Sequence, residues 1–134
     1  MWYHFSVAVP AGTTEASPVE QDLKVTHGVI KYLGIGFPTG CKQRVKARIY
    51  HLEHQIFPAN PDEPACWNGG IEGGEEHYKL EEAPYALTIR AYSPEAAAAH
   101  TITVFVLLLP VEVAEPWREQ ISLLDRIKNV FGLG

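Results

Sequence analysis

Three histidines carry chemistry that could support a metal site. His51 and His54 are separated by two residues, and His77 follows Glu76 further along the chain. Imidazole and carboxylate groups are common ligands of zinc, iron and nickel. Residues three apart on a regular strand point to opposite faces, so His51 and His54 converge only if a β-bulge lies between them. We therefore expect no bound metal and no cofactor, with His51, His54 and His77 as the candidate ligands if a metal is held.

Acidic and thiol groups give two further candidates. A glycine-rich segment contains Glu72, Glu75 and Glu76, whose oxygen atoms are of the kind that calcium prefers. The alternating ligand spacing of an EF-hand is missing, so a solvated loop is the preferred interpretation. Cys41 lies beside Lys42, which would lower the pKa of its thiol, but the sequence offers no catalytic Cys-His-Asn order. The chain is expected not to be an enzyme.

Trp67 lies in a long segment, 58–74, that is rich in proline and glycine. Loops of this length in compact domains usually have a function. The indole either provides a platform for a ligand or partner, or packs onto its own domain. The sequence leaves both interpretations open.

The C-terminal segment has helical periodicity. Beyond Pro116, which suits a first helical turn, apolar residues recur at spacings of three or four. Together with Trp67, they are the candidate interaction residues: Trp117, Ile121, Leu124, Ile127 and Phe131. The pattern predicts an amphipathic helix of about four turns, which packs on its own domain or lies in a groove of a neighbouring subunit. Residues 111–115 are expected to act as a hinge or an extended arm.

Period-2 alternation of apolar residues predicts strands through most of the remaining chain. They are expected at 3–9, 23–25, 33–37, 44–57, 77–80, 85–92 and 101–109. Turn signals separate them, which is typical of a mainly β fold. We predict an antiparallel β-sandwich of the jelly-roll type over residues 1–110, and a C-terminal arm and amphipathic α-helix in residues 111–134.

Three strand patterns are informative beyond the fold class. In 44–57, apolar residues occupy odd positions up to Ile49 and even positions from Leu52, which indicates a β-bulge or a strand that passes between two sheets. The strand 101–109 is apolar on both faces beyond Thr103, as expected for a central strand that is covered on both sides. Gly34 and Gly36 mark a place where a bulky neighbour could approach a strand closely.

The composition excludes several classes of protein. The chain has 134 residues, of which 46% are apolar and 20% charged, so one globular domain is expected. Its net charge of −5 argues against a strongly basic nucleic-acid binder and against binding to an anionic membrane. The basic cluster is interpreted as a solvated strand face: Lys42, Arg44, Lys46 and Arg48.

We expect the chain to be synthesised in a cytoplasm and to have no signal peptide. We also expect that Cys41 and Cys66 form no disulfide framework.

The segment Gly36-Phe37-Pro38-Thr39-Gly40, followed by two histidines, is similar to the cupin family. Cupins are small β-barrels with a glycine-rich turn before paired histidines and a glutamate. The resemblance implies a metalloenzyme that uses His51, His54 and His77. The sequence departs from the family pattern, because the paired histidines are not one residue apart and no second glycine-rich motif contains a later histidine.

A second resemblance extends over most of the chain. It comprises a strand that starts at residue 2, the turns Phe37-Pro38-Thr39-Gly40 and Ile56-Phe57-Pro58-Ala59-Asn60, the closing strand His100-Thr101-Ile102-Thr103-Val104, and the terminal helix. In these features the chain resembles small virion structural proteins of tailed bacteriophages, although it contains no diagnostic motif. The resemblance implies a capsid-decoration or other virion-surface role and a closed oligomer, often a trimer, that clamps neighbouring shell subunits.

These observations lead to one expected function and two alternatives. The chain is expected to be a non-enzymatic structural protein that self-associates and decorates or stabilises a larger assembly, a phage capsid or another virion part. Its contacts would be the strand edges, the segment 58–74 and the tail 111–131. The first alternative is a small carbohydrate-binding module that uses Trp67 and the acidic loop. The second is a cupin-like metalloenzyme.

Overall fold

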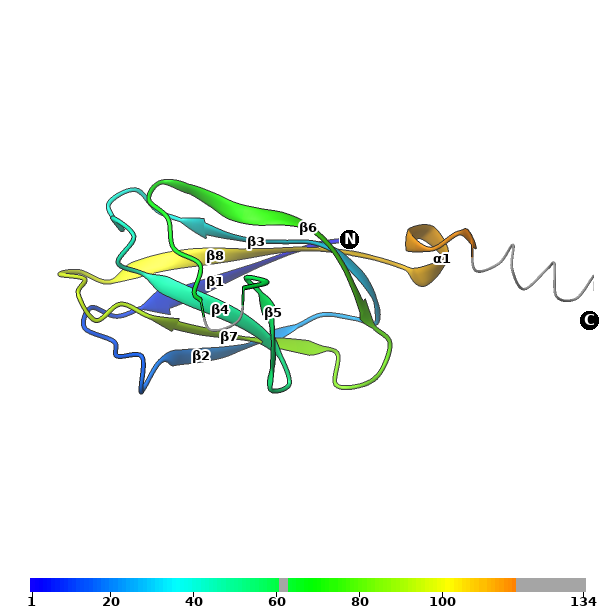
Figure 1. Cartoon of the computed structure of the whole chain (residues 1–134), viewed down its shortest axis with the longest axis horizontal. Coiled ribbons are helices and arrows are strands. Elements are labelled where there is room, and N and C mark those ends of the chain that lie inside the picture. The colour runs from blue at the N-terminus through cyan, green and yellow to red at the C-terminus, as the bar shows by residue number, and fades with distance from the viewer. Residues whose placement is uncertain (61–62, 118–134) are drawn as a thin grey trace, which may run out of the picture.

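The computed structural model describes residues 1–60 and 63–117, which fold into two stacked sheets with a short helix at one end (Figure 1). Within these residues, sheet A has the strand order β1-β8-β3-β6 and sheet B has the order β2-β7-β4-β5. All the strand pairs are antiparallel. The elements are β1 (Trp2–Val9), β2 (Val19–Lys24), β3 (Gly28–Phe37), β4 (Lys46–His51), β5 (His54–Phe57), β6 (Gly70–Leu80), β7 (Ala86–Tyr92), β8 (His100–Leu109) and α1 (Val111–Ala114). The predicted antiparallel β-sandwich is confirmed.

The two sheets bury one apolar core between them. Alternate residues of each strand point inward, so the period-2 pattern of the sequence becomes the inner surface of each sheet. The central strand β8 contributes Ile102, Val104, Val106 and Leu108, and sheet B contributes Leu23, Ala47, Ile49, Leu87 and Ile89. Burial of these side chains is the main source of stability.

The predicted strand 44–57 is two strands joined by a hairpin. β4 ends at His51, β5 begins at His54, and these two residues are paired. Between them, Leu52 has the left-handed conformation, with φ of 57°. The change of apolar phase therefore marks a tight turn and a register shift beside Ile49, not a strand that passes between the sheets. The turn contains no glycine or asparagine, the usual sequence signals of a hairpin.

The irregular segment predicted at 58–74 is shorter than expected, because β6 begins at Gly70. Gly73 and Gly74 have low β-propensity, but the pairing of β6 with β3 holds them in an extended strand. Part of the remaining loop folds onto the sandwich, where Ala65 forms a bridge with Ala47 of β4.

The segment Val111–Ala114 after β8 is helical, so an extended arm there is wrong, whereas the alternative of a hinge at 111–115 stays a prediction. α1 begins immediately after Pro110 and lies beyond the end of both sheets, beside the N-terminus (Figure 1). Of the predicted C-terminal helix, Trp117 is described, whereas Ile121, Leu124, Ile127 and Phe131 lie outside the described residues. No helix in the described part of the chain is long and apolar enough to cross a membrane.

Candidate functional site

The outer surface of sheet A carries a contiguous set of aromatic and aliphatic side chains. We call this set the apolar face: Trp2 of β1, Tyr32 of β3, Ile71 of β6, and Phe105 and Leu107 of β8. Trp2 and Ile71 are each 56% exposed, and the other three are partly exposed. Leu107 is the pairing partner of both Trp2 and Tyr32, and the Trp2 and Tyr32 rings meet edge to face at 5.6 Å. Exposed apolar surface of this kind typically marks a protein contact.

Glycines form the floor of the apolar face. The Tyr32 ring lies over Gly34 and Gly73, so closely that a Cβ atom on Gly73 would be 2.6 Å from the Tyr32 hydroxyl. A Cβ atom on Gly36 would be 3.1 Å from the Phe105 ring. The bulky neighbours expected beside Gly34 and Gly36 are therefore residues of the same sheet. Without side chains below them, the aromatic rings can lie low on the sheet and give a broad contact surface.

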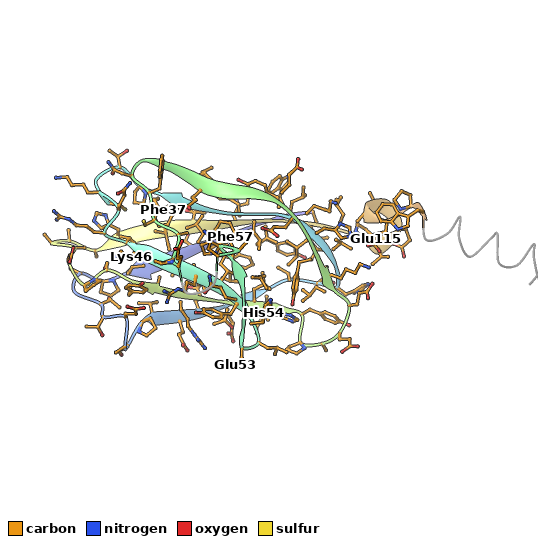
Figure 2. All side chains as sticks on the ribbon, in the orientation of Figure 1. Phe37, Lys46, Glu53, His54, Phe57 and Glu115 are labelled. Carbon is orange, nitrogen blue, oxygen red and sulfur yellow. The ribbon has the colours of Figure 1, made fainter. Side chains whose placement is uncertain are left out.

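The C-terminal end of the described chain is fixed at one end of this surface by a buried carboxylate. Glu115 is 1% exposed and lies just after α1 (Figure 2). Its Oε2 atom accepts a hydrogen bond from His77 Nε2 at 2.6 Å and pairs with Lys79 Nζ at 3.2 Å. His77 Nδ1 in turn accepts a hydrogen bond from Lys31 Nζ at 3.0 Å. Both partners of Glu115 project from the outer side of β6, so the chain emerges on the side of sheet A that carries the apolar face.

Trp117, two residues after Glu115, also contacts the outer side of β6. Its ring stacks on the imidazole of His77, with centroids 6.3 Å apart. It remains 49% exposed. Of the candidate interaction residues in the tail, Trp117 is thus placed beside sheet A with half of its surface free for a further contact.

The outer surface of sheet B has the opposite character. Arg48 and Arg90 face each other across β4 and β7. Arg48 pairs with Glu15 at 3.3 Å and Arg90 with Glu20 at 2.8 Å. Tyrosine rings lie under both guanidinium groups, Tyr50 under Arg90 at 4.5 Å and Tyr92 under Arg48 at 5.9 Å. The two arginines are thus partly neutralised by glutamates, which leaves a polar surface.

The basic cluster that was predicted to form one solvated strand face is divided between a strand and a turn. Lys46 and Arg48 belong to β4, but Lys42 and Arg44 precede it in a turn. Lys42 has φ of 50°, so the segment is not extended there. The four basic residues therefore do not lie on one strand face.

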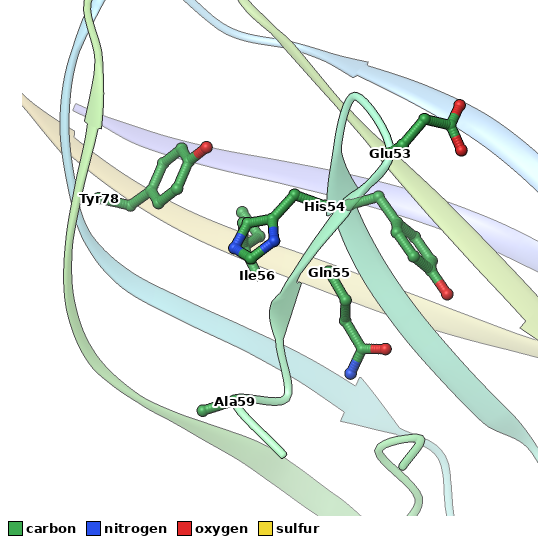
Figure 3. Close-up of a pocket in the computed structure, with 7 residues that line it drawn as sticks. Glu53, His54, Gln55, Ile56, Ala59 and Tyr78 are labelled. Atoms are coloured by element: carbon green, nitrogen blue, oxygen red, sulfur yellow. The ribbon is translucent and has the colours of Figure 1, made fainter. Parts of the chain in front are cut away.

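A cavity of about 540 Å³ lies between the β4–β5 hairpin and β6. It is lined by Tyr50, Glu53, His54, Gln55, Ile56, Ala59 and Tyr78 (Figure 3). The Tyr78 hydroxyl is hydrogen-bonded to His51 Nδ1 at 2.6 Å. Burial raises the pKa of Tyr78 and also that of Glu76, its neighbour on the same side of β6. The cavity combines aromatic rings with polar groups, which is a suitable lining for a small polar ligand.

The three histidines considered as metal ligands are not brought together. His51 and His54 are neighbours across the β4–β5 hairpin. His77 points to the outer side of β6, where it binds Glu115. Within residues 1–60 and 63–117, no three His, Cys, Asp or Glu side chains are grouped to hold a metal ion.

The remaining candidates are distributed over the molecule. Trp67 is half exposed and lies against the backbone of Gly70, and it does not line the cavity beside β5. Glu72 of the acidic segment accepts a hydrogen bond from the backbone amide of Cys66 at 2.9 Å. Cys41 is buried, and burial raises the pKa of its thiol, contrary to the lowering expected from Lys42.

The sequence reasoning missed the apolar face itself. Its residues lie on four strands, and none of them was a candidate interaction residue. The sequence contains one indication of the apolar face: the predicted strand 101–109 is apolar on both sides beyond Thr103. β8 is central in sheet A as predicted, but Phe105 and Leu107 on its outer side remain partly exposed in the described structure.

Two comparisons with known proteins bear on the identity of the chain. No family model matches the chain, and no curated protein matches it significantly.

Proposed function

We propose that this chain is a non-enzymatic structural protein that self-associates through the apolar face and decorates or stabilises a larger assembly. The observation that carries the proposal is the contrast between the two outer surfaces. Sheet A presents Trp2, Tyr32 and Ile71, whereas sheet B presents paired arginines and glutamates. Interface centres are rich in aromatic residues and poor in charge, so sheet A is the side suited to a protein contact.

The type of sandwich supports the same proposal. We propose a jelly roll, an eight-stranded fold made of two Greek keys. The order β1-β8-β3-β6 against β2-β7-β4-β5 supports it, because each sheet alternates strands from the two halves of the chain. Viral capsid domains commonly use this fold. With the resemblance to small virion structural proteins of tailed bacteriophages, this favours a virion protein that contacts capsid subunits and other copies of itself.

Substitution of Ile71 tests self-association through the apolar face. Ile71→Lys places a charge on the apolar face at an exposed position, so the fold should be retained. The matched control is Leu52→Lys in the β4–β5 turn, where the leucine is also exposed. Sedimentation velocity should show a multiple of 14.9 kDa for the unmodified chain and for Leu52→Lys, and a strong shift to the monomer for Ile71→Lys. A monomeric unmodified chain, or identical behaviour of both variants, would contradict the proposal.

The cavity beside β5 favours a second candidate function, the binding of a carbohydrate. Tyr50 and Tyr78 provide aromatic rings, and Glu53 and His54 provide polar groups at the cavity wall. Aromatic rings with nearby polar groups suit a sugar ring that is apolar on its face and polar at its edge. Maltotriose and chitotriose titrated into the labelled protein should shift amide NMR signals of β5 and β6, and Tyr78→Ala should abolish the shifts. Unchanged spectra with both sugars would remove this candidate.

A further inference from the structure

We propose that the apolar face of one copy is covered by residues 118–134 of a second copy. This inference rests on the proposed self-association and adds the identity of the segment that makes the contact. A neighbour would then be held through a tail and a sheet surface, with each copy donating one tail and receiving one.

The first reason is that β8 is built to be covered on both sides. Its inner side is buried from Ile102 to Leu108, and its outer side carries Phe105, Leu107 and Leu109. A strand that is apolar on both faces is typical of sheets with a layer on each side. At one end of sheet A that layer exists, because Val29 on the outer side of β3 is 0% exposed beside α1. Over Trp2, Tyr32 and Ile71 the described residues supply no such cover.

The second reason is where the described chain ends. Glu115 is fixed to His77 and Lys79 of β6, and Trp117 stacks on His77. Both contacts lie on the outer side of sheet A. The described chain therefore ends at an anchored position beside the apolar face, and residue 118 follows directly.

The third reason is the chemistry of the segment that follows. Its apolar residues Ile121, Leu124, Ile127 and Phe131 recur at helical spacing. Seventeen residues in a helix span about 25 Å, and a helix is about 10 Å wide. Four strands at a spacing of about 4.8 Å make a sheet surface about 19 Å wide, so one such helix laid along the strands covers about half of that width. The length and periodicity of the segment thus suit a contact with the apolar face.

Charge supports the same pairing. Residues 118–134 contain three basic and two acidic residues, while the chain as a whole has a net charge of −5. The segment is therefore positive and the remainder of the chain negative. Opposite charge favours the approach of the tail to the body of another copy.

The position of α1 favours a second copy over the same chain as the source of the tail. α1 lies beyond the end of both sheets (Figure 1). A segment that continued away from the sheets at this end would have to reverse direction to reach its own apolar face. A neighbouring copy needs no reversal, and mutual exchange of identical segments closes an oligomer without adding new surfaces.

Mixing two full-length variants tests the exchange directly. Ile71→Lys damages the receiving face, and Leu124→Asp damages the donated segment. The controls are Leu52→Lys for the face and Asn129→Asp for the polar side of the segment. Each damaging substitution alone should raise the concentration needed for association at least about tenfold. Neither control should do so.

An equimolar mixture of the two damaged variants should associate better than either alone. A mixed pair keeps one complete contact, made by the intact face of the Leu124→Asp copy and the intact segment of the Ile71→Lys copy. Native mass spectrometry separates the two copies by mass and should show mixed oligomers. Absence of mixed oligomers would overturn the exchange.

The same measurements separate this inference from the proposed function. If Leu124→Asp associates as the unmodified chain does while Ile71→Lys does not, the apolar face is an interface but its occupant is not the tail. If the unmodified chain is a monomer at every concentration, both proposals are wrong.

Discussion

At the scale of single residues, Glu115 is the most deeply buried charged group of the described chain. Its carboxylate is 1% exposed and is held by His77 and Lys79. Glu115→Ala should lower the free energy of unfolding by about 1–3 kcal/mol, because His77 and Lys79, which are both partly exposed, lose the acceptor that they share. Urea denaturation measures this change. Glu112→Ala, at an exposed position of α1, should change it by less than about 0.5 kcal/mol, and equal effects of both substitutions would refute the anchoring role.

Glu76 gives a prediction about pH. Burial raises the pKa of its carboxyl group in the folded protein. The folded state therefore binds more protons than the unfolded chain between the ordinary glutamate pKa and the raised value, so this group lowers stability as the pH rises through that window. Glu76→Gln removes the contribution, so its thermal unfolding midpoint should fall less between pH 4 and pH 7, values that bracket the ordinary glutamate pKa of about 4.3.

The control for this pH dependence is Glu82→Gln, in an exposed loop. It should keep the profile of the unmodified protein. If Glu76→Gln also keeps that profile, the carboxyl group of Glu76 is not responsible for the pH dependence.

At the scale of elements, the β3–β6 pair depends on two adjacent glycines in different ways. A Cβ atom on Gly73 would lie 2.7 Å from the Cα atom of Gly34, whereas a Cβ atom on Gly74 would have no neighbour within 4 Å. Gly73→Ala should therefore destabilise the fold by about 1–3 kcal/mol, because backbone must move. Gly74→Ala should be neutral or stabilise by up to about 1 kcal/mol. Thermal unfolding of the two variants side by side checks this, and equal midpoints would contradict the close packing of Tyr32 over the strand.

At the scale of the whole molecule, the two outer surfaces predict how association responds to salt. Contacts through the apolar face depend on burial of apolar area, which salt does not screen. Raising the salt concentration from about 0.05 M to about 0.5 M should leave the oligomer intact, whereas exposed ion pairs would be screened. Sedimentation at both concentrations measures this. Dissociation at high salt would contradict an association that depends on burial of the apolar face.

The strands were largely predictable because alternation is a local property. The patterns around Val7, Ile89 and Val104 follow from which residues must face a core, and each became a strand of the sandwich. The turn at Leu52 was not recognised, because its left-handed conformation has no glycine to mark it. The glycines at the start of β6 predict a loop, since only the pairing with β3 holds them extended. The burial of Cys41 was likewise decided by packing.

The sequence by itself determined that this chain forms a β-sandwich, because the spacing of apolar residues selects the inward side of every strand. It also showed that β8 has a second apolar side. Only the tertiary structure decided which residues share the outer surface. Trp2, Tyr32 and Leu107 are far apart in sequence but adjacent in sheet A, because long-range strand order and register bring β1, β3 and β8 together. The same pairing separated His77 from His51 and His54, so the described strands bring these three histidines to no common site.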